Sequence, residues 1–60
     1  MDIHFIKQYI GENCKIVLAN KFYYFCKIIN CDNNLVQIID RTGHKILIEP
    51  NSIILLEVCK

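Results

Sequence analysis

The sequence predicts a mainly-β fold, a small barrel or strongly bent sheet of five strands preceded by one short α-helix. The first observation is that apolar residues recur with the period of a helix up to Gly11 and alternate with a period of two after it. The second is that turn residues interrupt this alternation every six to ten residues. The third is length, because sixty residues hold one hydrophobic core and therefore one domain, over residues 1–60.

The first eleven residues, MDIHFIKQYIG, predict a helix over about residues 2–10. The apolar residues of one helical stripe are Ile3, Ile6 and Ile10. The Asp2 carboxylate is suited to capping the amino end, and Gly11 is suited to the left-handed conformation that commonly closes a helix. A helix this short is not stable alone in water, so we expect its apolar stripe to pack on the rest of the domain.

The strands are expected within residues 13–59. Their approximate ranges are 14–19, 22–31, 35–40, 44–49 and 53–59. Pro50 cannot donate a hydrogen bond to a sheet, so the chain is expected to break there into one turn of tight helix. In the second strand, Tyr24, Cys26 and Ile28 share the face expected to point inward. Val36 and Ile38 share one face of the third strand, and Ile46 and Ile48 share the inward face of the fourth.

The chain has four cysteines, Cys14, Cys26, Cys31 and Cys59. An even number in a short chain is typical of a disulfide scaffold. No secretory apolar segment opens the chain, however, and 53% of its residues are hydrophobic, whereas disulfide scaffolds are poor in large aliphatic residues. We therefore expect reduced thiols in a cytoplasmic protein. Because Cys26 and Cys31 lie inside an apolar run and neither His4 nor His44 is at finger spacing from them, no metal is expected.

The net charge of the chain and the motifs that it lacks argue against several classes of function. Seven Lys and Arg residues against six Asp and Glu give a net charge of +1, scattered along the chain, without the basic patch that phosphate-binding proteins usually have. No apolar run reaches the length of a membrane span, so no membrane partner is expected. The chain has no Gly-rich phosphate loop, no cysteine beside His44 and no carboxylate pair in an evident cleft. We expect no enzymatic activity, no cofactor and no small-molecule substrate.

The order of apolar and turn residues resembles that of a known family. The residues that carry the resemblance are Ile16, Leu18, Asn20, Tyr24, Cys26, Ile28, Asp32, Leu35, Val36, Ile38, Gly43, Ile48 and Ile53. Their order is similar to the Sm-like family, which includes bacterial RNA chaperones, and the resemblance extends from Phe5 to Val58. It implies an amino-terminal helix before a five-stranded, SH3-like barrel. It also implies a homo-oligomer, because the subunits of this family close into rings that bind single-stranded RNA.

The chain departs from the family where RNA contacts are expected. The Lys-His pair of the bacterial members aligns with Pro50 and Asn51, and their stacking aromatic residue aligns with Asn34. Lys21 and Cys26 stand in place of two glycines, and the Arg-Gly pair of the eukaryotic members is missing. These departures keep a second hypothesis open, in which the chain is a protein-interaction or structural module without RNA binding.

Two sets of residues are candidates for function. The candidate RNA contacts are Asn33, Asn34, Arg41, Lys45 and Asn51. The Asn33 and Asn34 amides could meet a base edge, although Asx residues also suit a tight turn. Arg41 and Lys45 could contact phosphate, or they could belong to a solvated hairpin tip.

The second set lies on the outward face of the second strand and comprises Tyr23, Phe25 and Ile29. A single barrel cannot easily bury them together with the inward face. Three explanations compete: the amino-terminal helix covers them, a second copy of the chain binds them, or RNA bases stack on Tyr23 and Phe25.

Overall fold

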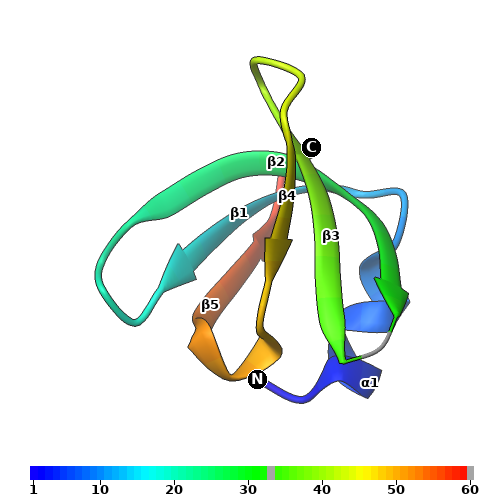
Figure 1. The fold of residues 1–60 in the computed structure, drawn as a ribbon, viewed down its shortest axis with the longest axis vertical. Coiled ribbons are helices and arrows are strands. Elements are labelled where there is room, and N and C mark those ends of the chain that lie inside the picture. The colour runs from blue at the N-terminus through cyan, green and yellow to red at the C-terminus, as the bar shows by residue number, and fades with distance from the viewer. Residues whose placement is uncertain (33, 60) are drawn as a thin grey trace.

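A computed structural model describes residues 1–32 and 34–59 of the protein. The chain begins with α1 (Ile3–Ile6), which continues as the 3-10 helix η1 (Lys7–Tyr9). The strands are β1 (Asn13–Leu18), β2 (Tyr23–Asp32), β3 (Leu35–Asp40), β4 (Lys45–Ile48) and β5 (Ile53–Val58). A second 3-10 helix, η2 (Pro50–Ser52), separates β4 from β5 (Figure 1). The mainly-β class and the short helix at the amino end are confirmed.

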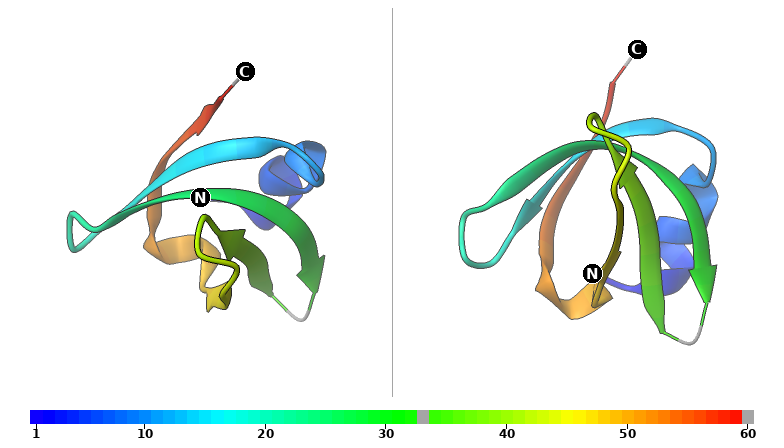
Figure 2. Two further views of the ribbon diagram at one scale, coloured as in Figure 1. Left: turned by 90° about the horizontal axis from the view of Figure 1, so that it is seen from above. Right: turned by 45° about the horizontal axis from the view of Figure 1, so that its top comes forward.

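The five strands form one antiparallel sheet in the order β4-β3-β2-β1-β5. The ten-residue strand β2 is long and curved, so that β3 and β4 fold back towards the side on which β5 lies (Figure 2). A register shift between Ile28 and Asn30 lies in the curved part of β2, where an extra residue bends the strand. Strands β4 and β5 are the two edges of the sheet and do not pair with each other. The sheet is therefore strongly bent but not closed.

The helix starts and stops near the predicted residues. The Asp2 carboxylate accepts a hydrogen bond from the His4 N–H at 3.1 Å, which confirms the predicted cap. Gly11 has a φ of +92°, which confirms its predicted left-handed conformation. The helix is shorter and tighter than expected, since α-helical geometry ends at Ile6 and a 3-10 turn follows, as is common at helix ends.

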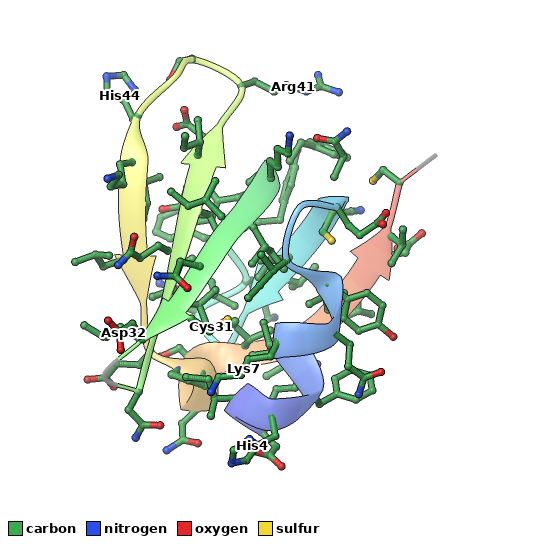
Figure 3. All side chains as sticks on the ribbon, turned by 90° about the vertical axis from the view of Figure 1, so that its right-hand side faces the viewer. His4, Lys7, Cys31, Asp32, Arg41 and His44 are labelled. Atoms are coloured by element: carbon green, nitrogen blue, oxygen red, sulfur yellow. The ribbon has the colours of Figure 1, made fainter. Side chains whose placement is uncertain are left out.

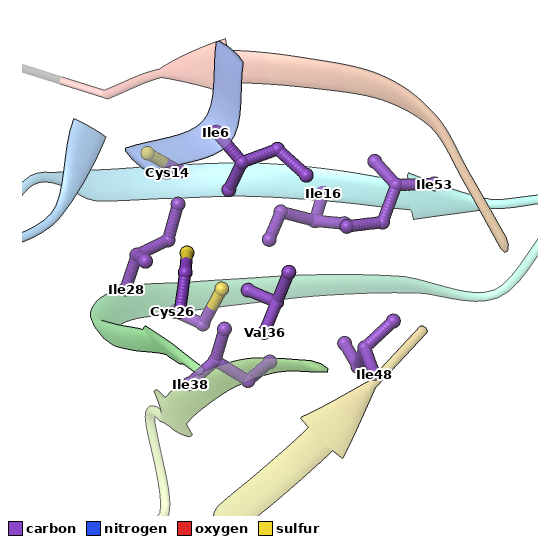
Figure 4. Close-up of a cluster of buried hydrophobic side chains, with 10 residues drawn as sticks. Ile6, Cys14, Ile16, Cys26, Ile28, Val36, Ile38, Ile48 and Ile53 are labelled. Atoms are coloured by element: carbon purple, nitrogen blue, oxygen red, sulfur yellow. The ribbon is translucent and has the colours of Figure 1, made fainter. Parts of the chain in front are cut away.

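The hydrophobic core lies inside the curve of the sheet, where α1 also packs (Figure 4). Its buried residues are Ile6, Cys14, Ile16, Cys26, Ile28, Cys31, Val36, Ile38, Ile48 and Ile53. The predicted inward face is confirmed in β3, where Val36 and Ile38 are both fully buried. Tyr24 and Ile46 point the predicted way but are only partly buried, at the border of the core.

Cys31 is buried although strict alternation from Ile28 would place it on the outward face. The register shift between Ile28 and Asn30 explains this, because one extra residue inverts the alternation beyond it. The second half of β2 therefore contributes Cys31 to the core, while Ile29 sits half-buried at the irregularity.

Candidate functional site

The candidate RNA contacts lie at opposite ends of the β3–β4 hairpin. At one end, Asn34 and Asn51 line a common hollow of about 420 Å³ together with Glu49 and Pro50. Asn34 has a φ of +62°, a conformation that Asn tolerates well in turns, so its presence suits the turn between β2 and β3. Among the described lining residues the only charge is the Glu49 carboxylate, which does not favour a phosphate. Asn33 lies outside the described residues.

At the other end, Arg41 and Lys45 flank the tip of the same hairpin, with Arg41 and His44 on opposite sides of the tip (Figure 3). The tip is organised by Asp40, whose Oδ1 accepts hydrogen bonds from the Thr42 hydroxyl at 2.7 Å and from the backbone N–H of His44 at 2.9 Å. The Thr42 bond first, and then the His44 bond, lower the pKa of the Asp40 carboxyl below its ordinary value. The Asp40 carboxylate therefore links Thr42 and His44 within the tip.

Arg41 joins the outward aromatic residues of β2. Its guanidinium carbon lies 4.7 Å from the centroid of the Phe25 ring. The Tyr23 and Phe25 rings are edge-to-face, with centroids 5.6 Å apart, and the Lys15 Nζ is 5.3 Å from the Tyr23 centroid and 5.7 Å from that of Phe25. These are distances at which a cation is attracted to the face of a ring. We call the four side chains, Lys15, Tyr23, Phe25 and Arg41, the aromatic-cation surface.

The strand pairing explains why these side chains meet. Tyr23 and Phe25 are two residues apart in one strand and therefore share a face, and Lys15 lies directly opposite Phe25 across the β1–β2 pair. Arg41 follows the last residue of β3, which pairs with the middle of β2, so its long side chain reaches Phe25. Lys15 was absent from the predicted site, although counting back from the β1–β2 turn would have placed it there.

The amino-terminal helix does not cover this surface. Ile6 is fully buried in the core on the inner side of the sheet, whereas 58% of Tyr23 and 36% of Phe25 stay exposed. The first of the three explanations for these residues is therefore wrong in the single chain. Ile29, which is half-buried, takes no part in the aromatic-cation surface. The other two hypotheses for Tyr23 and Phe25, contact with a second copy of the chain and stacking of RNA bases, stay predictions.

A cavity of about 380 Å³ adjoins the aromatic-cation surface. Its most buried lining residues are Cys14 and Cys26, which are 1% and 6% exposed. Phe25 and Arg41 belong both to this cavity and to the surface. The exposed Cys59, just beyond the end of β5, also lines it.

The four cysteines carry free thiols. Burial raises the pKa of Cys14 and Cys31, and it raises the pKa of Cys26 to about 12, because a thiolate loses its hydration inside the core. Cys59 is the one cysteine at the surface.

We expect one fast-reacting thiol per folded chain. At pH 8 a thiol reagent such as dithionitrobenzoate should modify Cys59 quickly and reach Cys14, Cys26 and Cys31 only when the chain unfolds, because the thiolate is the reactive form. Counting released chromophore before and after adding guanidinium chloride measures this, with Cys59→Ser as the control that should lose the fast phase. Two or more fast thiols in the folded protein would contradict the buried positions.

No protein-family model matches the chain, and no curated protein matches it. The resemblance to the Sm-like family is therefore carried by the residues of this sequence alone.

Two structural findings bear on the kind of site. In residues 1–32 and 34–59, no three or more His, Cys, Asp and Glu side chains are grouped so that they could hold a metal ion. Within the same residues, no helix has both the length and the apolar character needed to cross a membrane. The aromatic-cation surface and the adjoining cavity form the candidate site considered below.

Proposed function

We propose that the protein is a non-enzymatic binding module of the Sm-like, SH3-like barrel kind, which assembles as a homo-oligomer in the cytoplasm and binds single-stranded RNA with low sequence specificity. The observation that carries RNA binding is the aromatic-cation surface, where Tyr23 and Phe25 are exposed beside Lys15 and Arg41. Every base has a π-face, so stacking on such rings is tolerant of sequence. The two cations provide charge for the phosphates next to a stacked base.

The net charge agrees with this kind of binding. A net charge of +1, with the charged residues scattered along the chain, does not favour RNA binding that depends on phosphate neutralisation alone. Stacking contributes about 1–3 kcal/mol per base without a basic patch. The proposed RNA contacts are therefore aromatic first, with Lys15 and Arg41 as local partners for phosphate.

The assembly proposal rests on the two free edges of the sheet. Both edge strands carry exposed apolar side chains, Leu47 in β4 at 56% and Ile54 and Leu55 in β5 at 60% and 44%. An uncovered edge strand is a template for pairing with another chain. Pairing of β4 of one copy with β5 of the next would use two different surfaces, and repetition of such a contact closes into a ring when the rotation allows. A ring would also multiply weak RNA contacts.

The resemblance to the Sm-like family supports the same proposal, because the family combines an amino-terminal helix, five strands in this order and ring assembly. The bent sheet is compatible with a barrel whose two edges are completed by neighbouring copies. The hollow around Asn34 and Asn51 is a weaker candidate for RNA, since its one described charge is negative.

RNA binding is tested with Tyr23→Ala, which removes an exposed ring outside the cavity. Fluorescence anisotropy with labelled U-rich and A-rich oligonucleotides at low salt should show binding of the unmodified protein to both, weakening as salt is added. Tyr23→Ala should bind about tenfold more weakly, given the usual contribution of one stacked base. Phe22→Ala is the matched control, because Phe22 is 66% exposed and is not part of the aromatic-cation surface. Absence of binding by the unmodified protein, or equal losses in both variants, would contradict the proposal.

A protein-interaction or structural module without RNA binding is the second candidate. The exposed apolar side chains on both sheet edges favour it, because they suit assembly whether or not RNA is present. Such a module would have no affinity for either oligonucleotide, whatever its oligomeric mass.

A further inference from the structure

The cavity beside the aromatic-cation surface has room for one small chemical group, and its lining combines apolar and charged residues. Its volume of about 380 Å³ is near the lower end of the range for small-molecule sites, which is about 300–1,000 Å³. Phe25 and Ile39 supply apolar lining, and the buried thiols of Cys14 and Cys26 add little polarity. The Phe25 ring and the Ile39 side chain therefore offer an apolar surface against which the face of a base can pack.

The charged lining residues favour an anion next to that group. Lys27 and Arg41 provide two positive charges, and Asp40 provides one negative charge. The Asp40 Oδ1 already accepts hydrogen bonds within the β3–β4 turn, from the Thr42 hydroxyl and from the backbone N–H groups of Thr42 and His44. The two cations outnumber the one carboxylate in the lining, so the charge of the cavity is positive overall and complements a phosphate.

The cavity is continuous with the aromatic-cation surface. Phe25 and Arg41 belong to both, and the Phe25 ring centroid lies only 5.6 Å from that of Tyr23, the ring on which a base is proposed to stack. Single-stranded RNA is commonly recognised through bases that leave the stack and enter a pocket on the protein.

We propose that this cavity receives one unstacked base of single-stranded RNA, with Phe25 and Ile39 against the base and with Lys27 and Arg41 on its phosphate. This inference rests on the proposed RNA-binding function and names the nucleotide unit that the site takes. Tyr23 then holds a neighbouring base outside the cavity.

Cys59 at the cavity lining is a reporter for occupancy. The rate at which iodoacetamide alkylates Cys59 is followed by mass spectrometry with millimolar uridine 5′-monophosphate or ribose 5-phosphate present. The two ligands share sugar and phosphate, and only the first has a base. Uridine 5′-monophosphate should slow alkylation several-fold and ribose 5-phosphate should not. Equal slowing by both, or no slowing by the nucleotide, would overturn the inference.

A matched pair of variants tests whether a positive charge in the cavity lining, rather than positive charge anywhere on the protein, is needed for nucleotide binding. Arg41→Ala and Lys7→Ala each remove one exposed positive charge, but only Arg41 lines the cavity. Arg41→Ala should reduce the protection of Cys59 by uridine 5′-monophosphate at least threefold, and Lys7→Ala should leave it unchanged. Equal effects of the two variants would overturn the assignment of Arg41.

The oligonucleotide titration distinguishes failure of this inference from failure of the proposed function. If a U-rich oligonucleotide binds by anisotropy but leaves the alkylation rate of Cys59 unchanged, RNA binding stands and the base site in the cavity is wrong. If no oligonucleotide binds, the proposed function is wrong, and the inference, which depends on RNA binding, is wrong as well.

Discussion

Ile28→Ala is expected to lower the free energy of unfolding by about 2–5 kcal/mol and to leave much of the protein unfolded at 25 °C. Ile28 is fully buried in the core, next to the irregularity of β2, and its truncation leaves a cavity that the short strands around it cannot refill. A domain of sixty residues has little stability to lose, roughly 3–5 kcal/mol from a single core of this size.

The measurement is urea denaturation followed by circular dichroism, with all variants at one chain concentration because assembly would contribute to stability. Ile10→Ala is the matched control, since Ile10 is 42% exposed and outside the core, and it should cost less than about 1 kcal/mol. An Ile28→Ala protein with the denaturation midpoint of the unmodified chain would show that the inward face of β2 is assigned wrongly.

If the proposed assembly forms, the double variant Leu47→Lys with Ile54→Lys is expected to convert it to a monomer. Both side chains are more than half exposed in the single chain, so the substitutions should not disturb the core. They place positive charges on both strands of the proposed β4–β5 contact, where like charges on paired strands repel. Affinity for RNA should fall about a hundredfold or more with the loss of multivalent contact.

Light scattering after gel filtration measures the mass of this variant, and circular dichroism checks that it stays folded. Phe22→Lys is the control, because it places the same charge on an exposed apolar residue outside both edge strands and should keep the mass of the unmodified protein. A folded double variant with unchanged mass would exclude the edge strands as the interface.

Much of the fold could be predicted because its strands alternate and its turns carry turn residues. The predicted strand at residues 44–49 is found at Lys45–Ile48, and the break at Pro50 is the 3-10 helix η2. The burial of Cys31 could not be predicted, because it depends on one extra residue in β2 that alternation does not reveal. The alternation of apolar residues also could not predict whether the barrel closes, because closure depends on how far β2 bends. In the structure, β4 and β5 remain separate edges of the sheet.

The candidate site was only partly predictable. Tyr23 and Phe25 stand out in the sequence as surplus apolar residues, and the structure leaves them exposed. Arg41 was a candidate either for a phosphate contact or for a solvated hairpin tip, but its position over Phe25 follows from the β2–β3 register, which the sequence alone does not determine. In one of the three explanations, the amino-terminal helix covers the outward aromatic residues. The helix instead packs on the inner side of the sheet, where Ile6 is part of the core.

The mass of the unmodified chain in solution is the most direct test of the proposal that free sheet edges join copies into one RNA-binding assembly. Multi-angle light scattering across a hundredfold range of concentration should give one constant mass, several times the 7.1 kDa of a single chain. A mass of 7.1 kDa at every concentration would contradict it.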